Sequence, residues 1–192
     1  MDTIQKIDII LFYAINHIPH VWLGDFLGEA LSGFGYAWII WLVIGGILFL
    51  RKERKDHWFW VPLGIAAGAC YVVSEVFLKN AILRPRPDGL VDAIVVGVAP
   101  SSFSYPSTHA TIAFAFAYLF SRKELHWFWL YFLASAVGLS RIYLGHHFPS
   151  DVIGGMCLGT LIGLFSHGTD VYLHRIHRTL HHSHTKRKQK KV

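Results

Sequence analysis

The chain has 192 residues, the length of one domain, and 53% of them are apolar. The apolar residues form long runs separated by short polar stretches, which is typical of an integral membrane protein and argues against a soluble globular one. The net charge of +6 is uneven, because much of it follows Leu180 and culminates in residues 186–191. We expect one all-α helical membrane domain over residues 1–172 and a basic, His-rich cytoplasmic tail over residues 173–192.

The N-terminal part predicts two short helices rather than one span. Residues 4–17 alternate apolar and polar positions with a helical period, Pro19 interrupts the pattern, and a second apolar run covers residues 21–31. Each run is shorter than the roughly 20 residues that a membrane-spanning helix needs. Interfacial, re-entrant and broken-span arrangements all remain open for this segment.

The remaining helices are easier to place. We expect apolar helices over residues 35–50, 58–78, 110–120, 127–139 and 152–165, with a polar loop over residues 88–105. Cys70 and Cys157 both fall inside these apolar runs, so we interpret them as small buried hydrophobic residues and not as a disulfide.

Basic residues in short loops predict the orientation. Residues 51–55, the turn at 121–124 and the C-terminal tail are basic, and alternate connections place all three on one face of the membrane. The positive-inside rule makes that face cytoplasmic. The opposite connections carry residues 79–87, 106–109 and 141–151. We therefore expect three polar motifs to meet on the outer face.

The tail itself is interpreted as a disordered end, with attraction to anionic lipid headgroups as the functional alternative. Its histidines imply no defined ligand geometry, so we expect no metal site and no cofactor. They are His174, His177, His181, His182 and His184.

The first motif carries Lys79, Arg84 and Arg86, with Pro85 and Pro87 ending the helix. Arginine offers a planar fork that suits phosphate oxygens, and lysine offers a point charge. A basic flank that complements the helix dipole is the structural alternative. Glu75 lies four residues before Lys79, which predicts an ion pair along one helix face.

The second motif, Pro106-Ser107-Thr108-His109, precedes an apolar helix. Ser107 is the expected N-cap, and the free backbone N–H groups of Ser107, Thr108 and His109 would then form an anion site. His109 could donate a proton to a leaving oxygen. An ordinary capped helix with an incidental histidine is the alternative.

The third motif places Asp151 in the first turn of a helix that Pro149 begins. From there the carboxylate can reach back to an imidazole in the preceding turn and orient it for nucleophilic attack. Arg141 lies six residues upstream of His147 and could hold phosphate. His146 is adjacent to His147, and the residues alone leave the choice between the two open.

Together these motifs resemble the pattern of the type 2 phosphatidic acid phosphatase (PAP2) superfamily, K-x6-RP, PSxH and SR-x5-H-x3-D, over roughly residues 20–172. The resemblance selects His147 over His146. It implies a six-helix, all-α core and metal-independent hydrolysis through a phosphohistidine on His147, which Asp151 orients, while His109 protonates the leaving group. The phosphate would be held by Lys79, Arg86, Ser107, Thr108 and Arg141.

Thr108 departs from the pattern, because many members have Gly there and the bacterial undecaprenyl diphosphate phosphatases often have Asp. The short chain resembles the latter, so we expect hydrolysis of undecaprenyl diphosphate to undecaprenyl phosphate. Phosphatidylglycerophosphate and phosphatidate are the alternative substrates. Vanadium haloperoxidases share the cradle but are larger and soluble.

A non-catalytic protein that binds or transports lipid phosphate would be expected to lose His109 or His147, and this chain keeps both. The expected partners are a lipid phosphate and membrane lipids, with no nucleic acid. The oligomeric state stays open.

Overall fold

The structure is a computed structural model that describes residues 3–32, 36–53, 58, 60–98, 100–123 and 127–189. Within these ranges the chain is helical with no strand, which confirms the all-α prediction. The elements are α1 (Thr3–Asn16), α2 (Trp22–Ser32), α3 (Tyr36–Leu48), the π-helical η1 (Phe49–Glu53), α4 (Trp60–Tyr71), the π-helical η2 (Val72–Leu78), α5 (Lys79–Ile82), the 3-10 helix η3 (Pro87–Gly89), α6 (Thr108–Ser121), α7 (Trp127–Tyr143) and α8 (Pro149–Gln189).

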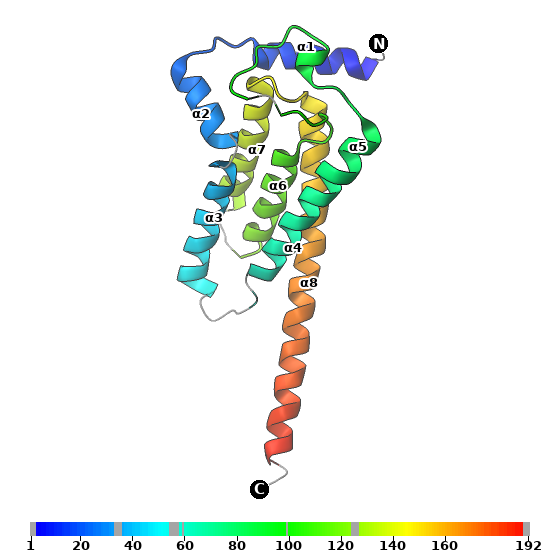
Figure 1. Cartoon of the computed structure of the whole chain (residues 1–192). Helices are drawn as coiled ribbons and strands as arrows, with labels where there is room; N and C mark the ends of the chain where they lie inside the picture. Colours follow the sequence, from blue (N-terminus) through cyan, green and yellow to red (C-terminus); the bar gives the residue numbers. More distant parts are fainter. Residues whose placement is uncertain are drawn as a thin grey trace.

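Helix α6 is the central element of the bundle. It contacts α3, α4, α7 and α8, and most of its side chains are buried. A helix that is apolar all round is stable only when other elements surround it. Figure 1 shows α6 enclosed in this way, with α8 running beside it and beyond the end of the bundle.

Three glycines at four-residue intervals, Gly155, Gly159 and Gly163, let α8 approach α6 closely. A Cβ atom at Gly155 would lie 2.6 Å from the carbonyl oxygen of Ser107, and one at Gly159 would meet the backbone of Thr111 more closely still. Small residues at this spacing allow helix backbones to pack tightly. The packing sets the start of α6 against the start of α8.

The outer surface of the bundle is apolar. Among the described residues, two helices are long and apolar enough to cross a membrane, Trp60–Gly89 and Pro149–Leu173, and Ile39–Arg51 and Thr108–Ser121 are shorter apolar helices. Large hydrophobic side chains are exposed along α3, α7 and α8, for example Leu42, Phe128, Trp129, Phe132, Leu161 and Phe165. An apolar surface of this extent fits contact with lipid rather than water.

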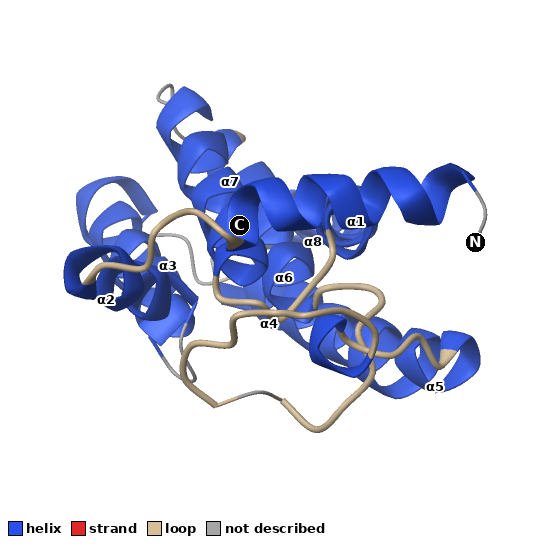
Figure 2. Cartoon of the chain, turned by 90° about the horizontal axis from the view of Figure 1, so that it is seen from above, coloured by secondary structure: helices blue, strands red, loops and turns tan. Residues whose placement is uncertain are grey.

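Helix α1 lies across one end of the bundle, crosswise to α7 and α8, as Figures 1 and 2 show. Its 14 residues span about 21 Å, less than the hydrocarbon core of a bilayer. Of the arrangements left open for residues 4–17, this placement matches the interfacial one.

Two expectations were wrong in part. The backbone of the tail is helical through Gln189, because α8 continues beyond Gly168 with no glycine or proline to end it. Cys70 is buried as expected, whereas Cys157 is exposed because it lies on the outer side of α8; neither forms a disulfide. The boundary at residue 172 remains a prediction.

All three polar motifs lie at the end of the bundle that α1 crosses. The end of α3, the C-terminal end of α6 and the C-terminal end of α8 lie at the opposite end in Figure 1. The prediction that the motifs share one face is therefore confirmed for the described residues. Which side of the membrane that face occupies remains a prediction.

Candidate active site

Lys79 is positioned by the π-helical segment η2, in which its backbone N–H bonds back five residues to the carbonyl of Ser74. Its ammonium lies 2.7 Å from a carboxylate oxygen of Glu75 and 3.1 Å from the hydroxyl of Ser102. The predicted Glu75–Lys79 ion pair is confirmed. Thr108 donates its hydroxyl to the same Glu75 oxygen over 2.6 Å, so η2 and α6 meet at this carboxylate.

Arg86 is held in a fixed orientation by carbonyl oxygens. The chain leaves α5 through Leu83, whose φ is 55°, and extends to Arg86. The guanidinium donates to the carbonyl of Ser102 over 2.7 Å and to that of His146 over 2.7 Å. Its Nη1 lies 3.3 Å from Nε2 of His147. The planar fork is therefore set in place beside the imidazole.

The loop between α7 and α8 presents His147. The backbone N–H groups of His146 and His147 donate to the carbonyl of Arg141 over 3.0 and 3.2 Å. Gly145 has φ of +78°, and a Cβ there would collide with the backbone carbonyl of Ile94. Only glycine meets both conditions without strain. The His147 side chain ends up 1% exposed.

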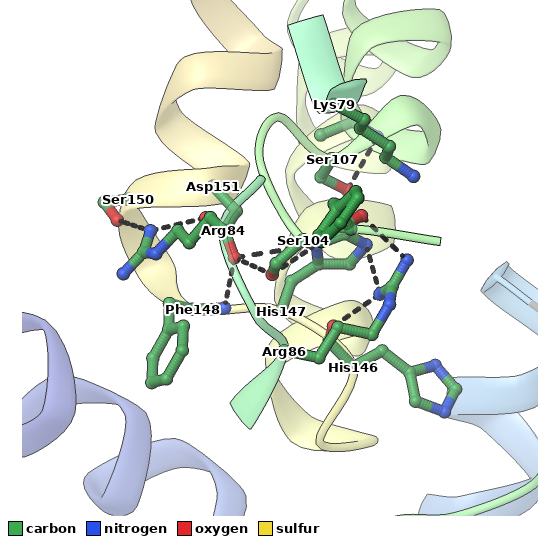
Figure 3. Close-up of polar contacts among 12 residues, drawn as sticks. Lys79, Arg84, Arg86, Ser104, Ser107, His146, His147, Phe148, Ser150 and Asp151 are labelled. Carbon is green, nitrogen blue, oxygen red and sulfur yellow. Dashed lines mark hydrogen bonds and ion pairs between the residues drawn. The ribbon is translucent and has the colours of Figure 1, made fainter. Parts of the chain in front are cut away.

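Asp151 lies beside the His147 imidazole, as expected, and Ser104 makes a further contact with both groups. The distance from Nδ1 of His147 to Oδ2 of Asp151 is 3.6 Å, longer than a good hydrogen bond. Ser104 donates its hydroxyl to that oxygen and lies 3.5 Å from Nδ1 (Figure 3). Oδ2 also accepts the backbone N–H of Phe148 over 2.8 Å, so it caps α8.

These contacts define the tautomer of His147. A guanidinium can only donate, so Nε2, which faces Arg86, must be the acceptor. The proton then lies on Nδ1, facing Ser104 and Asp151. Burial, and next the charges of Arg86 and Arg141, hold the pKa of His147 well below its usual value. The imidazole is neutral at neutral pH, with the Nε2 lone pair toward the cations.

The second motif agrees with its prediction only in part. Ser107 is the N-cap of α6, as expected, and its hydroxyl accepts the N–H of Ala110 over 3.5 Å. Its own N–H is not free, because it donates to the carbonyl of Asp151 over 3.0 Å. Close α6–α8 packing brings that carbonyl within reach. His109, in the first turn of α6, lies within electrostatic reach of Arg141 and His147.

Four polar residues of the site were missed or given no role. Ser102 joins Lys79 to Arg86, and Ser104 joins Asp151 to His147. Arg84 donates to the other oxygen of Asp151 over 2.5 Å and to Asp8 of α1 over 2.5 Å. The available signals were the serines immediately before the second motif and a lone carboxylate within an apolar N-terminal helix.

The arrangement as a whole is suited to a tetrahedral anion. Lys79, Arg86 and Arg141 are each buried, with 3%, 7% and 3% of their surfaces exposed, and they act on one another electrostatically. Among the described residues, the carboxylates that act on Lys79 and Arg86 are Glu75, Asp88 and Asp151. Fixed cations around a neutral imidazole can bind a phosphate group and leave its phosphorus open to attack. No cluster of three or more metal-ligating side chains occurs within the ranges the structure covers.

Residues 59–175 match the model of the PAP2 superfamily, which is more than half of the chain. The chain belongs to the PAP2 superfamily. A decaprenylphosphoryl-5-phosphoribose phosphatase of Mycobacterium tuberculosis is 37% identical over 138 residues, covering 70% of this chain and 74% of that protein. An undecaprenyl-diphosphatase of Sulfolobus acidocaldarius is 30% identical over 159 residues, covering 81% and 75%.

Among solved structures, the transmembrane PAP2-type phosphatidylglycerolphosphate phosphatase of Bacillus subtilis has a TM-score of 0.69 and 27% identity, covering 90% of this chain and 88% of that one. The fold is therefore that of the membrane PAP2 phosphatases, as predicted. The chain is a phosphoric ester hydrolase of a family of membrane lipid phosphatases.

Proposed function

We propose that this PAP2 protein is a metal-independent lipid phosphatase that releases the terminal phosphate of a polyprenyl diphosphate, converting undecaprenyl diphosphate to undecaprenyl phosphate. One observation carries the chemistry: Nε2 of His147 faces Arg86, while Nδ1 faces Ser104 and Asp151. This is the orientation that an imidazole nucleophile needs.

In the first step, the Nε2 lone pair of His147 attacks the terminal phosphorus and the bond to the bridging oxygen breaks. Lys79, Arg86 and Arg141 stabilise the charge on the phosphoryl oxygens. The hydroxyl of Ser107 and the backbone N–H of Thr108, at the start of α6, donate further hydrogen bonds to these oxygens. His109 takes up a proton when the anionic substrate offsets the cations around it, and it then passes that proton to the leaving oxygen, so undecaprenyl phosphate departs. The positive charge on the His147 ring is offset by Asp151 through Ser104.

In the second step, water attacks the phosphohistidine and His109 accepts its proton. The N–P bond breaks, inorganic phosphate leaves, and His147 regains its neutral form. No metal is needed to generate the nucleophile, because the lowered pKa of His147 already keeps Nε2 unprotonated at neutral pH.

The choice of a polyprenyl substrate draws support from the two curated relatives, whose names both refer to polyprenyl lipids. The Mycobacterium relative favours a second candidate, a phosphate monoester on a sugar linked to polyprenyl phosphate. Phosphatidylglycerophosphate and phosphatidate remain the glycerolipid alternatives. We place the site on the outer face because the basic connections lie at the other end of the bundle.

The test is phosphate release by the purified protein with EDTA present. Undecaprenyl diphosphate, a polyprenyl-linked sugar phosphate, phosphatidylglycerophosphate and phosphatidate are compared at equal concentrations. We expect the diphosphate to give the highest kcat/KM, and we expect vanadate to inhibit. Preference for another lipid would overturn the substrate assignment, and loss of activity in EDTA would overturn the metal-independent mechanism.

Neighbouring histidines provide a matched pair of variants. We expect His147→Gln to lower kcat at least about a thousandfold, because it removes the nucleophile. His146→Gln should retain most activity, since its ring points away from His147 in Figure 3. Melting temperatures of both variants show whether they fold. An active, folded His147→Gln protein would refute the mechanism.

A further inference from the structure

Helix α1 turns one narrow polar-and-aromatic face toward the active site. Asp8, Phe12 and Asn16 lie four residues apart on that face and are buried, with 4%, 0% and 0% of their surfaces exposed. Asn16 closes the far end, where its side chain bonds the carbonyls of Ile94 and Tyr143 over 2.8 Å each. The PAP2 motifs include no residue of this helix.

Asp8 contacts both Ser150 at the start of α8 and Arg84 of the first motif. One carboxylate oxygen accepts the backbone N–H of Ser150 over 2.8 Å, and the other accepts its hydroxyl over 2.6 Å. The second oxygen also accepts Arg84 over 2.5 Å. An anion at a helix N-terminus is stabilised by the free N–H groups and by the dipole.

Arg84 lies between two carboxylates. Its Nη2 donates to Asp8 and its Nη1 donates to Oδ1 of Asp151 over 2.5 Å. Oδ1 is the oxygen of Asp151 that Ser104 does not use, so Arg84 fixes the rotation of the carboxylate that faces His147. Asp8 shares the charge of Arg84. Arg84 therefore weakens the field of Asp151 at the His147 ring less than it would without Asp8.

Aromatic packing holds the same guanidinium in place. Its central carbon lies 4.6 Å from the centre of the Phe148 ring, the residue after His147. Phe12 of α1 packs against the same ring, with the two ring centres 5.4 Å apart. Arg84 is thus fixed by a carboxylate from α1, a carboxylate from α8 and an aromatic face supported by α1.

We propose that α1 is part of the catalytic apparatus, and that Asp8 is a positioning residue that acts through Arg84 on Asp151. This inference rests on the proposed function, since it assumes that Asp151 supports His147. The hydrogen bonds of Asp8 go to Arg84 and Ser150, not to His147. Its effect should therefore fall on the chemical step and leave substrate binding nearly unchanged.

The experiment measures kcat and KM for Asp8→Asn with the polyprenyl diphosphate. We expect kcat to fall about 10-fold or more with KM changed less than about twofold. Asp8→Glu, which keeps the charge, should recover part of the loss. Lys6→Gln is the matched control, because Lys6 lies on the same helix outside this face and its removal should change neither constant.

A double-substitution cycle separates positioning from simple destabilisation. If Asp8 acts through Arg84, Asp8→Asn should cost little further kcat in an Arg84→Gln protein. If Asp8→Asn does not fold, Ser150→Ala replaces it in the cycle, because the Ser150 hydroxyl links Asp8 to Arg84. Fully additive effects would overturn the inference.

The outcomes also distinguish this inference from the proposed function. An unchanged kcat in Asp8→Asn, with His147→Gln inactive, would overturn the role of α1 alone. An inactive wild-type protein, or an active His147→Gln protein, would overturn the proposed function itself.

Discussion

At the scale of single residues, the most informative one is Ser104. It is fully buried, it donates to Asp151, and it lies about as close to Nδ1 of His147 as Asp151 does. Helical spacing correctly placed Asp151 one turn from the imidazole. It could not show that the same carboxylate oxygen would also cap α8 at Phe148 and accept the Ser104 hydroxyl.

Replacing Ser104 should therefore lower kcat without preventing the substrate phosphate from binding. We expect Ser104→Ala to lower kcat about 10- to 100-fold, the effect of losing a hydrogen bond to a charged group. Ser101→Ala is the control, because Ser101 is exposed in the same loop. Steady-state kinetics measure both variants. A wild-type kcat in Ser104→Ala would show that Asp151 reaches His147 without help.

The phosphate-binding residues were easier to predict than their supports. Lys79, Arg86 and Arg141 are costly charges in an apolar chain, and the expected convergence of their motifs on one face indicated a site. Ser102 and Arg84 act by holding those groups, and a serine or arginine near a helix end has many ordinary explanations. Their partners lie up to 76 positions away, as Asp8 does from Arg84, and a single sequence does not show such pairs.

At the scale of elements, the approach of α8 to α6 decides where the site forms. The glycines at positions 155, 159 and 163 let the backbones approach, so that Ser107 bonds the carbonyl of Asp151. The helices themselves were predicted from apolar runs, and their starts at Ser107 and Pro149 were predicted from capping residues. The spacing of the glycines can be read from the sequence, but the sequence does not show which helix packs against them.

A methyl group on this face should push the helices apart. We expect Gly159→Ala to destabilise the protein by about 1–3 kcal/mol and to lower activity, because the added Cβ would overlap the Thr111 backbone. Gly168→Ala on the same helix has open space around its Cβ and should be neutral or stabilising. Thermal unfolding in detergent compares them. Equal melting temperatures would contradict this account of the packing.

For the whole molecule, the distribution of basic residues among the loops predicted where the three motifs lie, which the local sequence of each motif did not. Basic connections on one face implied that the three motifs share the other, and the structure brings them together at one end. What could not be predicted is that α1 crosses this end and contributes Asp8. A polar residue on a short amphipathic helix usually faces water, and only the tertiary contact with Arg84 shows otherwise.

The central claim is that phosphate passes through a covalent bond to His147. The most direct measurement is rapid quenching of the protein with polyprenyl diphosphate labelled in its terminal phosphate, followed by peptide mapping under alkaline conditions. The account predicts label on the peptide that contains His147, formed in EDTA at a rate consistent with kcat and absent from His147→Gln. Turnover with no labelled peptide, or with the label on another histidine, would contradict it.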